Sequence, residues 1–292
     1  MVVANYDVVV IGLGPAGVIA SIHLKREGFS VAGVEAEKVG GALNDASIIE
    51  NLPVCGGAVA APEIIKSLEE SIENHGIEIV KERVIKIQKR KSEFVVVGKE
   101  RVLRAKCVII ACGLVPKKYP ELKKSDNVFY RARDVGEVAG STLTIIGGSD
   151  AAFDAAQRFA GNAEKVHIIA RGKLKAVAPL VKRARENPKV QIFEGVKIRQ
   201  ILTEKRVEIQ LQNGQIIESD KLLVCIGKER ELSIFPQKLK RKLEGKKLIS
   251  HELCRGMYAA GDFLNPNARY LSTALGSGMQ AAVLAAKFLR GE

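Results

Sequence analysis

The sequence predicts an α/β protein with two Rossmann-like domains of the three-layer ββα type, the second inserted into the first. A strand runs into a glycine-rich turn and a helix at residues 6–24, and the same order returns at 142–160, which predicts two similar units. The last strand and helix, after about residue 257, pair better with the first unit than with the second. This predicts the insertion.

The first turn reads Gly-Leu-Gly-Pro-Ala-Gly and directly follows the β-branched strand at residues 6–11. Gly12 permits the tight turn, Gly14 lets the backbone approach a pyrophosphate, and Gly17 lets the helix pack closely on the strand. A second strand ends at Glu35, 18 residues past Gly17, where an acid accepts hydrogen bonds from a ribose. The pattern predicts a dinucleotide site at the start of the helix.

The second turn has the altered pattern G-x-S-x-x-A, in Gly147-Gly148-Ser149-Asp150-Ala151-Ala152. A strand at 142–146 precedes it, and a helix to about 160 and a strand at 165–170 follow it. Ser149 replaces the middle glycine, so its side chain either crowds a phosphate or donates a hydrogen bond to it. Two such units in one chain suggest a flavin in one and a nicotinamide in the other.

Each turn is followed by further elements. In the first unit we expect a loop at 40–57, a helix at about 62–75, a three-stranded antiparallel excursion drawn from segments 77–80, 84–89, 94–97 and 102–104, and a buried strand at 107–111. Pro116 and Pro120 then mark a domain crossing. In the second unit we expect a helix at 174–186, strands near 190–193, 196–203 and 206–211, a hairpin turn at Asn213-Gly214 and a strand at 221–226. A lysine-rich crossing leads to the strand near 257 and a terminal helix at about 274–290.

The five cysteines include no C-x-x-C, so no redox-active disulfide is predicted. Cys107 and Cys225 are expected to be buried in strands, whereas Cys55 and Cys254 are expected in loops. No metal site is predicted.

The formal net charge is +13, with basic clusters at 86–91, 117–118, 123–124 and 238–247. A solvated surface rich in lysine and glutamate explains this charge, and so does steering of an acidic protein partner or an anionic substrate. Nucleic-acid binding is not expected, because aromatic residues make up only 5% of the chain and Trp is absent. No apolar run approaches the length of a membrane span, and the N-terminus lacks the pattern of a signal peptide, so a cytoplasmic protein is expected.

Several segments in order and spacing resemble one known family. They are Gly12-x-Gly14-Pro-Ala-Gly17, Gly40-Gly41-x-Leu43, Glu50-Asn51-x-Pro53, Ala111-Cys112-Gly113, Ile146-Gly-Gly-Ser-Asp-Ala-Ala, Ile226-Gly227 and Tyr258-Ala-Ala-Gly261-Asp262. Over nearly the whole chain they resemble the low-molecular-weight thioredoxin reductase-like flavoproteins. The resemblance implies that residues 1–116 and 229–292 hold FAD, that residues 117–228 hold NAD(P)H, and that the protein is a homodimer.

The resemblance also assigns candidate residues. For FAD they are Gly12, Gly14, Pro15, Ala16, Gly17, Glu35, Ala36, Gly41, Ala42, Leu43, Asn51, Val84, Ala111, Cys112, Gly113, Gly261, Asp262, Tyr270, Leu271 and Ser272. For NAD(P) they are Gly147, Gly148, Ser149, Asp150, Ala151, Arg171, Lys173, Lys175, Ile226 and Gly227. No catalytic acid or base is predicted, and Asp154 is the candidate for a contact on the nicotinamide side.

The sequence departs from the family in two places. Thioredoxin reductases carry C-x-x-C just before the second glycine turn, and this chain has Tyr130-Arg-Ala-Arg133-Asp134 there. That stretch is more similar to the branch of ferredoxin or flavodoxin–NADP reductases, which pass electrons from flavin to a small acidic carrier. The NADP-type arginine cluster is replaced by Arg171, Lys173 and Lys175, which favours NADPH and leaves NADH open.

The sequence therefore predicts an FAD-dependent oxidoreductase that passes electrons from NAD(P)H to a non-thiol acceptor such as ferredoxin or flavodoxin. A thioredoxin reductase-like protein that acts on disulfides without its own C-x-x-C is a second interpretation. A flavin-binding protein without turnover is a third, favoured by Ser149 and by the sparse basic motif.

Overall fold

The structure is a computed structural model that describes residues 2–120, 122–123, 125–245 and 247–292. The chain forms two compact units. The first comprises residues 1–44, 49–115 and 230–292, and the second comprises residues 45–48 and 116–229. Lys124 and Lys246 of the predicted basic clusters, and the side chain of Cys55, lie outside the described part.

The first unit is built on a mixed sheet in the order β19-β20-β8-β1-β2-β5. Its strands are β1 (Val2–Ile11), β2 (Val31–Glu35), β5 (Glu78–Lys81), β8 (Arg101–Ile110), β19 (Glu252–Cys254) and β20 (Met257–Ala259). The neighbours from β20 to β5 run parallel. Strands β6 (Lys86–Arg90) and β7 (Glu93–Val97) continue antiparallel from β8. The carboxyl ends of the parallel strands therefore meet at one edge of the sheet.

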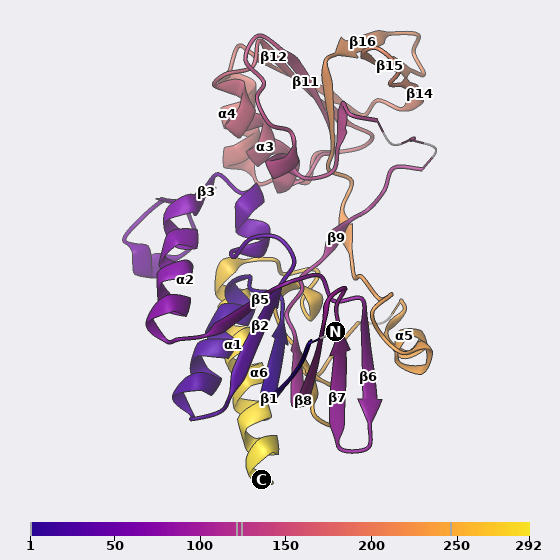
Figure 1. The fold of residues 1–292 in the computed structure, drawn as a ribbon. Helices are drawn as coiled ribbons and strands as arrows, with labels where there is room; N and C mark the ends of the chain where they lie inside the picture. Colours follow the sequence, from indigo (N-terminus) through magenta and orange to yellow (C-terminus); the bar gives the residue numbers. More distant parts are fainter. Residues whose placement is uncertain (1, 121, 124, 246) are drawn as a thin grey trace. The chain divides into compact units, whose positions relative to one another are not determined.

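Helices α1 (Pro15–Arg26) and α6 (Leu271–Arg290) lie side by side in this unit, although they come from opposite ends of the chain (Figure 1). A Cβ added at Gly278 of α6 would lie only 2.3 Å from the carbonyl oxygen of Ala16. The absence of a side chain at Gly278 thus permits this close packing. The remaining helical and short elements of the unit are η2 (Pro53–Cys55), β4 (Val59–Ala60), α2 (Ala61–Asn74), α5 (Gln237–Leu243) and η4 (Gly261–Phe263), whereas η1 (Gly41–Asp45) and β3 (Ile48–Ile49) each contain residues assigned to both units.

Alternate residues of the buried strands face two hydrophobic clusters. In β1, Val9 and Ile11 belong to one cluster, whereas Val8 and Val10 belong to the other. Successive side chains of a strand point to opposite faces, so the apolar run buries both faces of the sheet.

The second unit contains a parallel sheet in the order β10-β17-β11-β12-β13. Its strands are β10 (Val128–Phe129), β11 (Thr142–Ile146), β12 (Lys165–Ala170), β13 (Val190–Glu194) and β17 (Lys221–Val224). Helices α3 (Asp150–Ala160) and α4 (Ala178–Glu186) pack on one hydrophobic cluster, and the antiparallel strands β14 (Ile198–Leu202), β15 (Val207–Leu211) and β16 (Ile216–Ser219) pack on another. The short helix η3 (Ala132–Asp134) precedes β11, and β9 (Val115–Pro116) pairs with β18 (Lys228–Glu229). This gives the layers of a ββα unit.

Several predicted boundaries are wrong. Segment 77–80 forms β5, which pairs parallel with β2 and does not join the antiparallel excursion. The excursion instead uses β8, a continuous strand that contains the segment predicted at 102–104 and residues 107–110 of the segment predicted at 107–111. Helix α4 begins at Ala178 because the preceding loop is held by Gly148, whose carbonyl accepts the amides of Lys175 and Ala176 at 2.7 and 3.1 Å.

Two further elements differ from the prediction at their ends. Helix α6 begins at Leu271, three residues earlier than predicted. Cys254 is the last residue of β19 and is half-buried, which corrects its placement in a loop. Cys225 is half-buried and follows the end of β17, so its predicted burial within a strand is wrong as well. No helix in the described residues combines the length and apolar character that a bilayer span requires.

Candidate dinucleotide sites

The turn between β1 and α1 is closely packed against the end of β8. A Cβ added at Gly12, where φ is +94°, would lie 2.6 Å from the carbonyl oxygen of Ala111. A Cβ added at Gly17 would lie 1.8 Å from the carbonyl oxygen of Gly12. Side chains are therefore excluded at both positions by the protein's own backbone.

Gly14 differs, because the protein leaves room beside it. The nearest atom to an added Cβ is the Cα of Gly41, at an ordinary contact distance of 3.7 Å. Gly14 is the N-cap of α1, and no side chain there caps the helix, whose first turn contains no acidic residue. Unpaired amides and a positive dipole end are suited to an anion, so these residues fit the diphosphate of a dinucleotide.

Glu35 lies beside this turn, as its place at the end of β2 requires. Its Oε2 accepts the amide of Leu13 at 2.9 Å, and its Oε1 accepts the amide of Glu37 at 2.9 Å. A carboxylate has about four lone-pair sites, so acceptor capacity remains for a ribose hydroxyl.

Other predicted FAD residues lie at the same strand edge. Ala111, Cys112 and Gly113 follow β8, and Gly261 and Asp262 follow β20. The amide of Ala111 donates to Ile11 at 2.8 Å, and a Cβ added at Gly261 would lie 3.0 Å from the Cβ of Ala16. Cys112 is exposed, although its neighbour Ala111 is buried. Strand ends and turns thus bring together segments that are far apart in sequence.

The start of α6 also lacks a side-chain cap. Tyr270 is its N-cap and is 52% exposed, Leu271 is buried, and Ser272 is exposed. The other FAD candidates of the first unit are Pro15 and Ala16 in α1, the exposed Ala36 after β2, and Ala42 and buried Leu43 in η1.

The two remaining predicted FAD residues, Asn51 and Val84, differ in exposure. Asn51 is exposed in the loop before η2. The side chain of Val84 is buried in the hydrophobic core, where it packs with β1, β6 and β8. Burial leaves little of Val84 accessible to a ligand.

The second glycine turn is built in the same manner. A Cβ added at Gly147 would lie 2.5 Å from the carbonyl oxygen of Cys225, and Ser149 is the N-cap of α3 without a side-chain cap bond. The exposed Asp150 accepts the amide of Val177 at 2.9 Å, and Ala151 is exposed in the first turn of α3. Ile226 and Gly227 follow β17. The start of α3 therefore lacks a side-chain cap, as the start of α1 does, but it differs from α1 in carrying an acidic residue, Asp150, in its first turn.

Arg171, Lys173 and Lys175 are exposed in the loop after β12. The bonds from Lys175 and Ala176 to Gly148 hold this loop against the glycine turn. The loop thus places three basic residues beside the second candidate site.

The second unit contains an ion pair that the sequence did not predict. Arg133 donates to Asp45 from Nε at 3.0 Å, from Nη2 at 2.8 Å and from its backbone amide at 3.2 Å. Burial alone would raise the pKa of Asp45, but the Arg133 guanidinium lowers it below its ordinary value. Asp154 accepts the amide of Ser47 at 3.1 Å, and burial raises the pKa of Asp154. Nothing in the local sequence pattern signals these contacts, because Asp45 and Ser47 lie about 100 residues before their partners.

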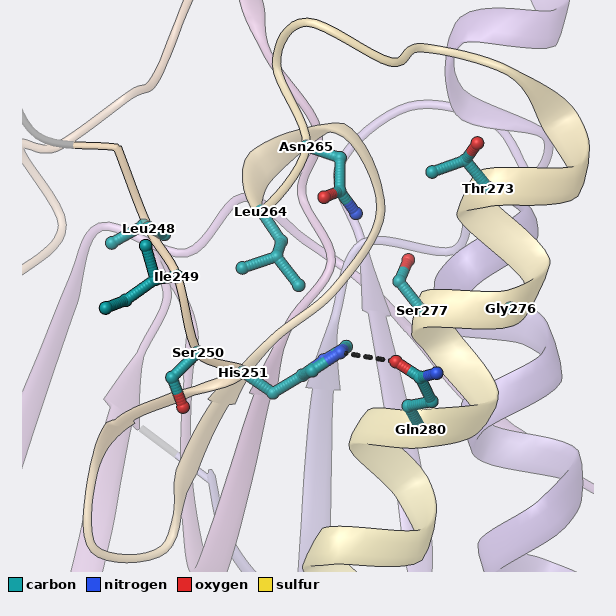
Figure 2. Close-up of a pocket in the computed structure, with 10 residues that line it drawn as sticks. All are labelled: Leu248, Ile249, Ser250, His251, Leu264, Asn265, Thr273, Gly276, Ser277 and Gln280. Atoms are coloured by element: carbon teal, nitrogen blue, oxygen red, sulfur yellow. Dashed lines mark hydrogen bonds between the residues drawn. The ribbon is translucent and has the colours of Figure 1, made fainter.

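A cavity of about 350 Å³ lies elsewhere in the first unit, between segments 248–251, 264–265 and 273–280. Figure 2 shows His251 directed at Gln280, and its Nε2 lies 2.8 Å from Oε1 of that residue. None of the predicted cofactor residues lines this cavity. Among the described residues, no group of three His, Cys, Asp or Glu side chains is arranged to hold a metal ion.

Comparisons with known proteins agree with this geometry. A thioredoxin reductase from Ureaplasma parvum is 27% identical, with 97% of each chain covered. A ferredoxin–NADP reductase from Ignicoccus hospitalis is 28% identical and covers 97% of this chain and 98% of its own length. The solved thioredoxin reductase of Lactococcus lactis superposes with a TM-score of 0.86 at 25% identity, covering 98% of this chain and 100% of that one.

These similarities confirm the predicted fold class and the resemblance to thioredoxin reductase-like flavoproteins. Residues 6–286 match the family model described as pyridine nucleotide-disulphide oxidoreductase. At the level of this family, the predicted enzyme class, an NAD(P)H-dependent flavoprotein oxidoreductase, and the predicted cofactors FAD and NAD(P)H are also confirmed. The chain belongs to the pyridine nucleotide-disulphide oxidoreductase family.

Proposed function

We propose that this protein passes electrons from NAD(P)H, through FAD, to an acceptor that carries its own redox centre and is not a disulfide. In this proposal the first unit holds FAD and the second holds the nicotinamide nucleotide. When bound, FAD supplies the capacity to take up a hydride and to release electrons singly or in pairs.

The residues of the first unit have distinct tasks in this proposal. The amides at the start of α1 bind the diphosphate, and Glu35 accepts a ribose hydroxyl. Asp262 orients the ribityl–phosphate region, and the uncapped start of α6 stabilises negative charge on a reduced flavin. Hydride transfer needs position and field more than a protein acid or base, so no catalytic proton donor is assigned.

The second unit binds the nucleotide at the start of α3. Arg171, Lys173 and Lys175 supply positive charge for a 2′-phosphate, which favours NADPH over NADH. Asp154 accepts the Ser47 amide at 3.1 Å, and its carboxylate retains acceptor capacity for a contact on the nicotinamide side.

The observation that carries the non-thiol acceptor is the segment Tyr130–Asp134. It occupies the place of the family's C-x-x-C, and its Arg133 forms the three bonds to Asp45 described above. A guanidinium cannot exchange with a disulfide. Among the cysteines whose side chains are described, Cys107, Cys112, Cys225 and Cys254 are all free thiols. The Ignicoccus relative named as a ferredoxin–NADP reductase supports the same acceptor class.

The direct test is anaerobic stopped-flow reduction, with the flavin absorbance near 450 nm followed after mixing with NADPH or NADH. We expect the flavin to bleach rapidly with NADPH and then to reoxidise on addition of a ferredoxin or flavodoxin. A flavin that stays oxidised with both nucleotides contradicts the proposal and supports a flavin-binding protein without turnover.

A disulfide acceptor is the second candidate, because several relatives are named thioredoxin reductases. It requires thiols from a partner or a lone cysteine such as Cys55. NADPH-dependent reduction of thioredoxin by the wild type and by Cys55→Ser decides between these two sources of thiols. Turnover in both proteins favours the partner's thiols. Turnover that is lost in the variant favours Cys55.

We also propose a homodimer and an acidic electron carrier as partners. Val283 and Leu284 of α6 are each 38% exposed and Ile249 is 93% exposed, which supports an interface on the first unit. Analytical ultracentrifugation of the holoprotein tests the dimer.

A further inference from the structure

Arg230 is not one of the proposed cofactor residues, but it contacts residues that directly follow one of them, Asp262. It is the first residue of the segment that returns to the first unit after β18. Its Nε donates to the carbonyl oxygen of Phe263 at 2.6 Å, and its Nη2 lies 3.5 Å from the carbonyl oxygen of Leu264. The guanidinium carbon lies 5.6 Å from the centroid of the Phe263 ring.

These contacts are made at the end of η4, the short helix that contains Asp262. Phe263 is its last residue and Leu264 is its C-cap, so their carbonyls lack donors within the helix. Phe263 is 0% exposed. The Arg230 guanidinium therefore supplies donors to carbonyls at a helix end that water does not easily reach. Burial lowers the pKa of Arg230, but a guanidinium stays charged at neutral pH.

The beginning of η4 is held separately by α6. The amide of Gly261 donates to Oγ of Ser277 at 2.9 Å, and that hydroxyl donates to the carbonyl of Ala274 at 3.1 Å. Figure 2 shows Ser277 on α6 beside the loop that carries Leu264 and Asn265. Asp262 thus lies between two anchors, one at each end of a three-residue helix.

We propose that Arg230 is a positioning residue for FAD, because it fixes the backbone that presents Asp262 to the ribityl–phosphate region. This inference rests on the proposed function, in which Asp262 contacts FAD. In this proposal Arg230 acts through the backbone of η4, by its contacts with Phe263 and Leu264. Ser277 holds the other end of the same helix and shares the task.

The test compares Arg230→Met, which keeps the length and apolar stem but removes all donors, with Arg230→Lys, which restores one donor and the charge. Arg104→Met is the matched control, because Arg104 is also in the first unit and its exposed side chain pairs with Glu93 at 3.8 Å. Three quantities are measured: the dissociation constant of FAD, the visible circular dichroism of bound flavin, and the thermal midpoint of the apoprotein.

We expect Arg230→Met to weaken FAD binding by about tenfold and to change the visible circular dichroism of the flavin. Arg230→Lys should weaken FAD binding about threefold. Arg104→Met should have the FAD affinity and the dichroism of the wild type. Unchanged FAD affinity and dichroism in Arg230→Met overturn the proposal. So does weaker binding that merely follows a lower thermal midpoint with an unchanged dichroism, since that indicates a structural role only.

If Arg230→Met does not fold, Arg230→Lys decides: intermediate affinity supports the proposal, and wild-type affinity with wild-type dichroism overturns it. Failure of the proposed function gives a different result, because the wild type itself then binds no FAD.

Discussion

At the scale of single residues, the glycines of the first turn have separable tasks. Gly17 is required by the fold, since an added Cβ would lie 1.8 Å from a backbone oxygen, whereas Gly14 has space around it. The sequence motif alone treats both as one signature. The structure therefore distinguishes Gly17, which packing within the protein requires, from Gly14, where the expected requirement is the close approach of a ligand.

We expect Gly14→Ala to weaken FAD binding by at least about tenfold while the apoprotein keeps its thermal midpoint, because the methyl group meets only the approaching diphosphate. Gly17→Ala should instead destabilise the apoprotein by about 1–3 kcal/mol or more through overpacking. FAD titration by fluorescence and thermal unfolding of both variants measure these effects. A stable Gly17→Ala protein, or a Gly14→Ala protein with normal affinity, would contradict this division.

His167 gives the second unit a dependence on pH. It is 8% exposed in β12, its Nδ1 lies 3.4 Å from Thr144 Oγ1, and burial followed by the charge of Lys165 lowers its pKa from 6.5 to about 4. Between these two values the unfolded chain binds the proton and the folded chain does not. We therefore expect the stabilisation linked to neutral His167 to be complete above pH 6.5 and to decrease as the pH falls toward 4, by about 3 kcal/mol in total.

The measurement is urea unfolding at several values of pH between 7 and 4.5, for the wild type and His167→Phe. The Phe ring keeps the edge contact with Phe193, whose centroid lies 5.7 Å from that of His167, and it does not titrate. We expect the difference in stability between the two proteins to change with pH over this window. A constant difference would show that His167 is not the responsible group.

At the scale of elements, the sequence was informative where strands and glycine turns follow one another. The parallel cores of both units, the hairpin at Asn213-Gly214 and the helix after each turn were predicted from local pattern. The parallel pairing of β5 with β2 was not predicted, because a short alternating segment fits a parallel edge strand and an antiparallel hairpin equally well. Contacts such as Arg133 with Asp45 depend on the folded chain, and no local pattern reports them.

Segment 45–48 should be released from the second unit when that ion pair is broken. The side chains of Arg133 and Asp45 are only 20% and 17% exposed, so removal of one partner leaves a charge that is largely buried. We expect Asp45→Asn to increase amide hydrogen exchange at Ser47 and Arg133 by roughly tenfold or more. Exchange followed by mass spectrometry measures this.

Glu194→Gln is the matched control, since that carboxylate is in the second unit but pairs with Arg185 at the surface, at 3.6 Å. Because the pKa of Asp45 is lowered, the stabilisation it gives should be present above its ordinary value of 3.8 and be lost only as the pH falls further. Equal exchange in the Asp45 variant and the wild type would refute the role of the pair.

The loop after β12 should decide between the two nicotinamide nucleotides. Replacing Arg171 with Ala should raise the KM for NADPH by roughly fivefold to tenfold and leave the KM for NADH nearly unchanged, because only NADPH carries the 2′-phosphate. Steady-state kinetics with both nucleotides measure the ratio. An equal increase in the KM for both nucleotides would mean that the loop does not contact the 2′-phosphate.

At the scale of the whole molecule, the net charge of +13 concerns partners more than the fold. If the acceptor is an acidic carrier, its association with the reduced protein should slow by roughly tenfold between about 20 and 300 mM salt, since screening shortens the range of attraction. Stopped-flow mixing with the carrier at increasing salt measures the rate. Reduction by NADPH at each salt concentration is the control, and an association rate independent of salt would favour the surface explanation of the charge.

Because β20 and α6 complete the first unit, the order of synthesis matters. When the ribosome has made residue 229, every residue of the second unit exists, but the first still lacks the helix that packs on α1 through Gly278. Domains generally fold as they emerge. The nascent chain must therefore keep its N-terminal strands competent, with the apolar side of α1 uncovered, until translation of the last helix allows the earlier half to close.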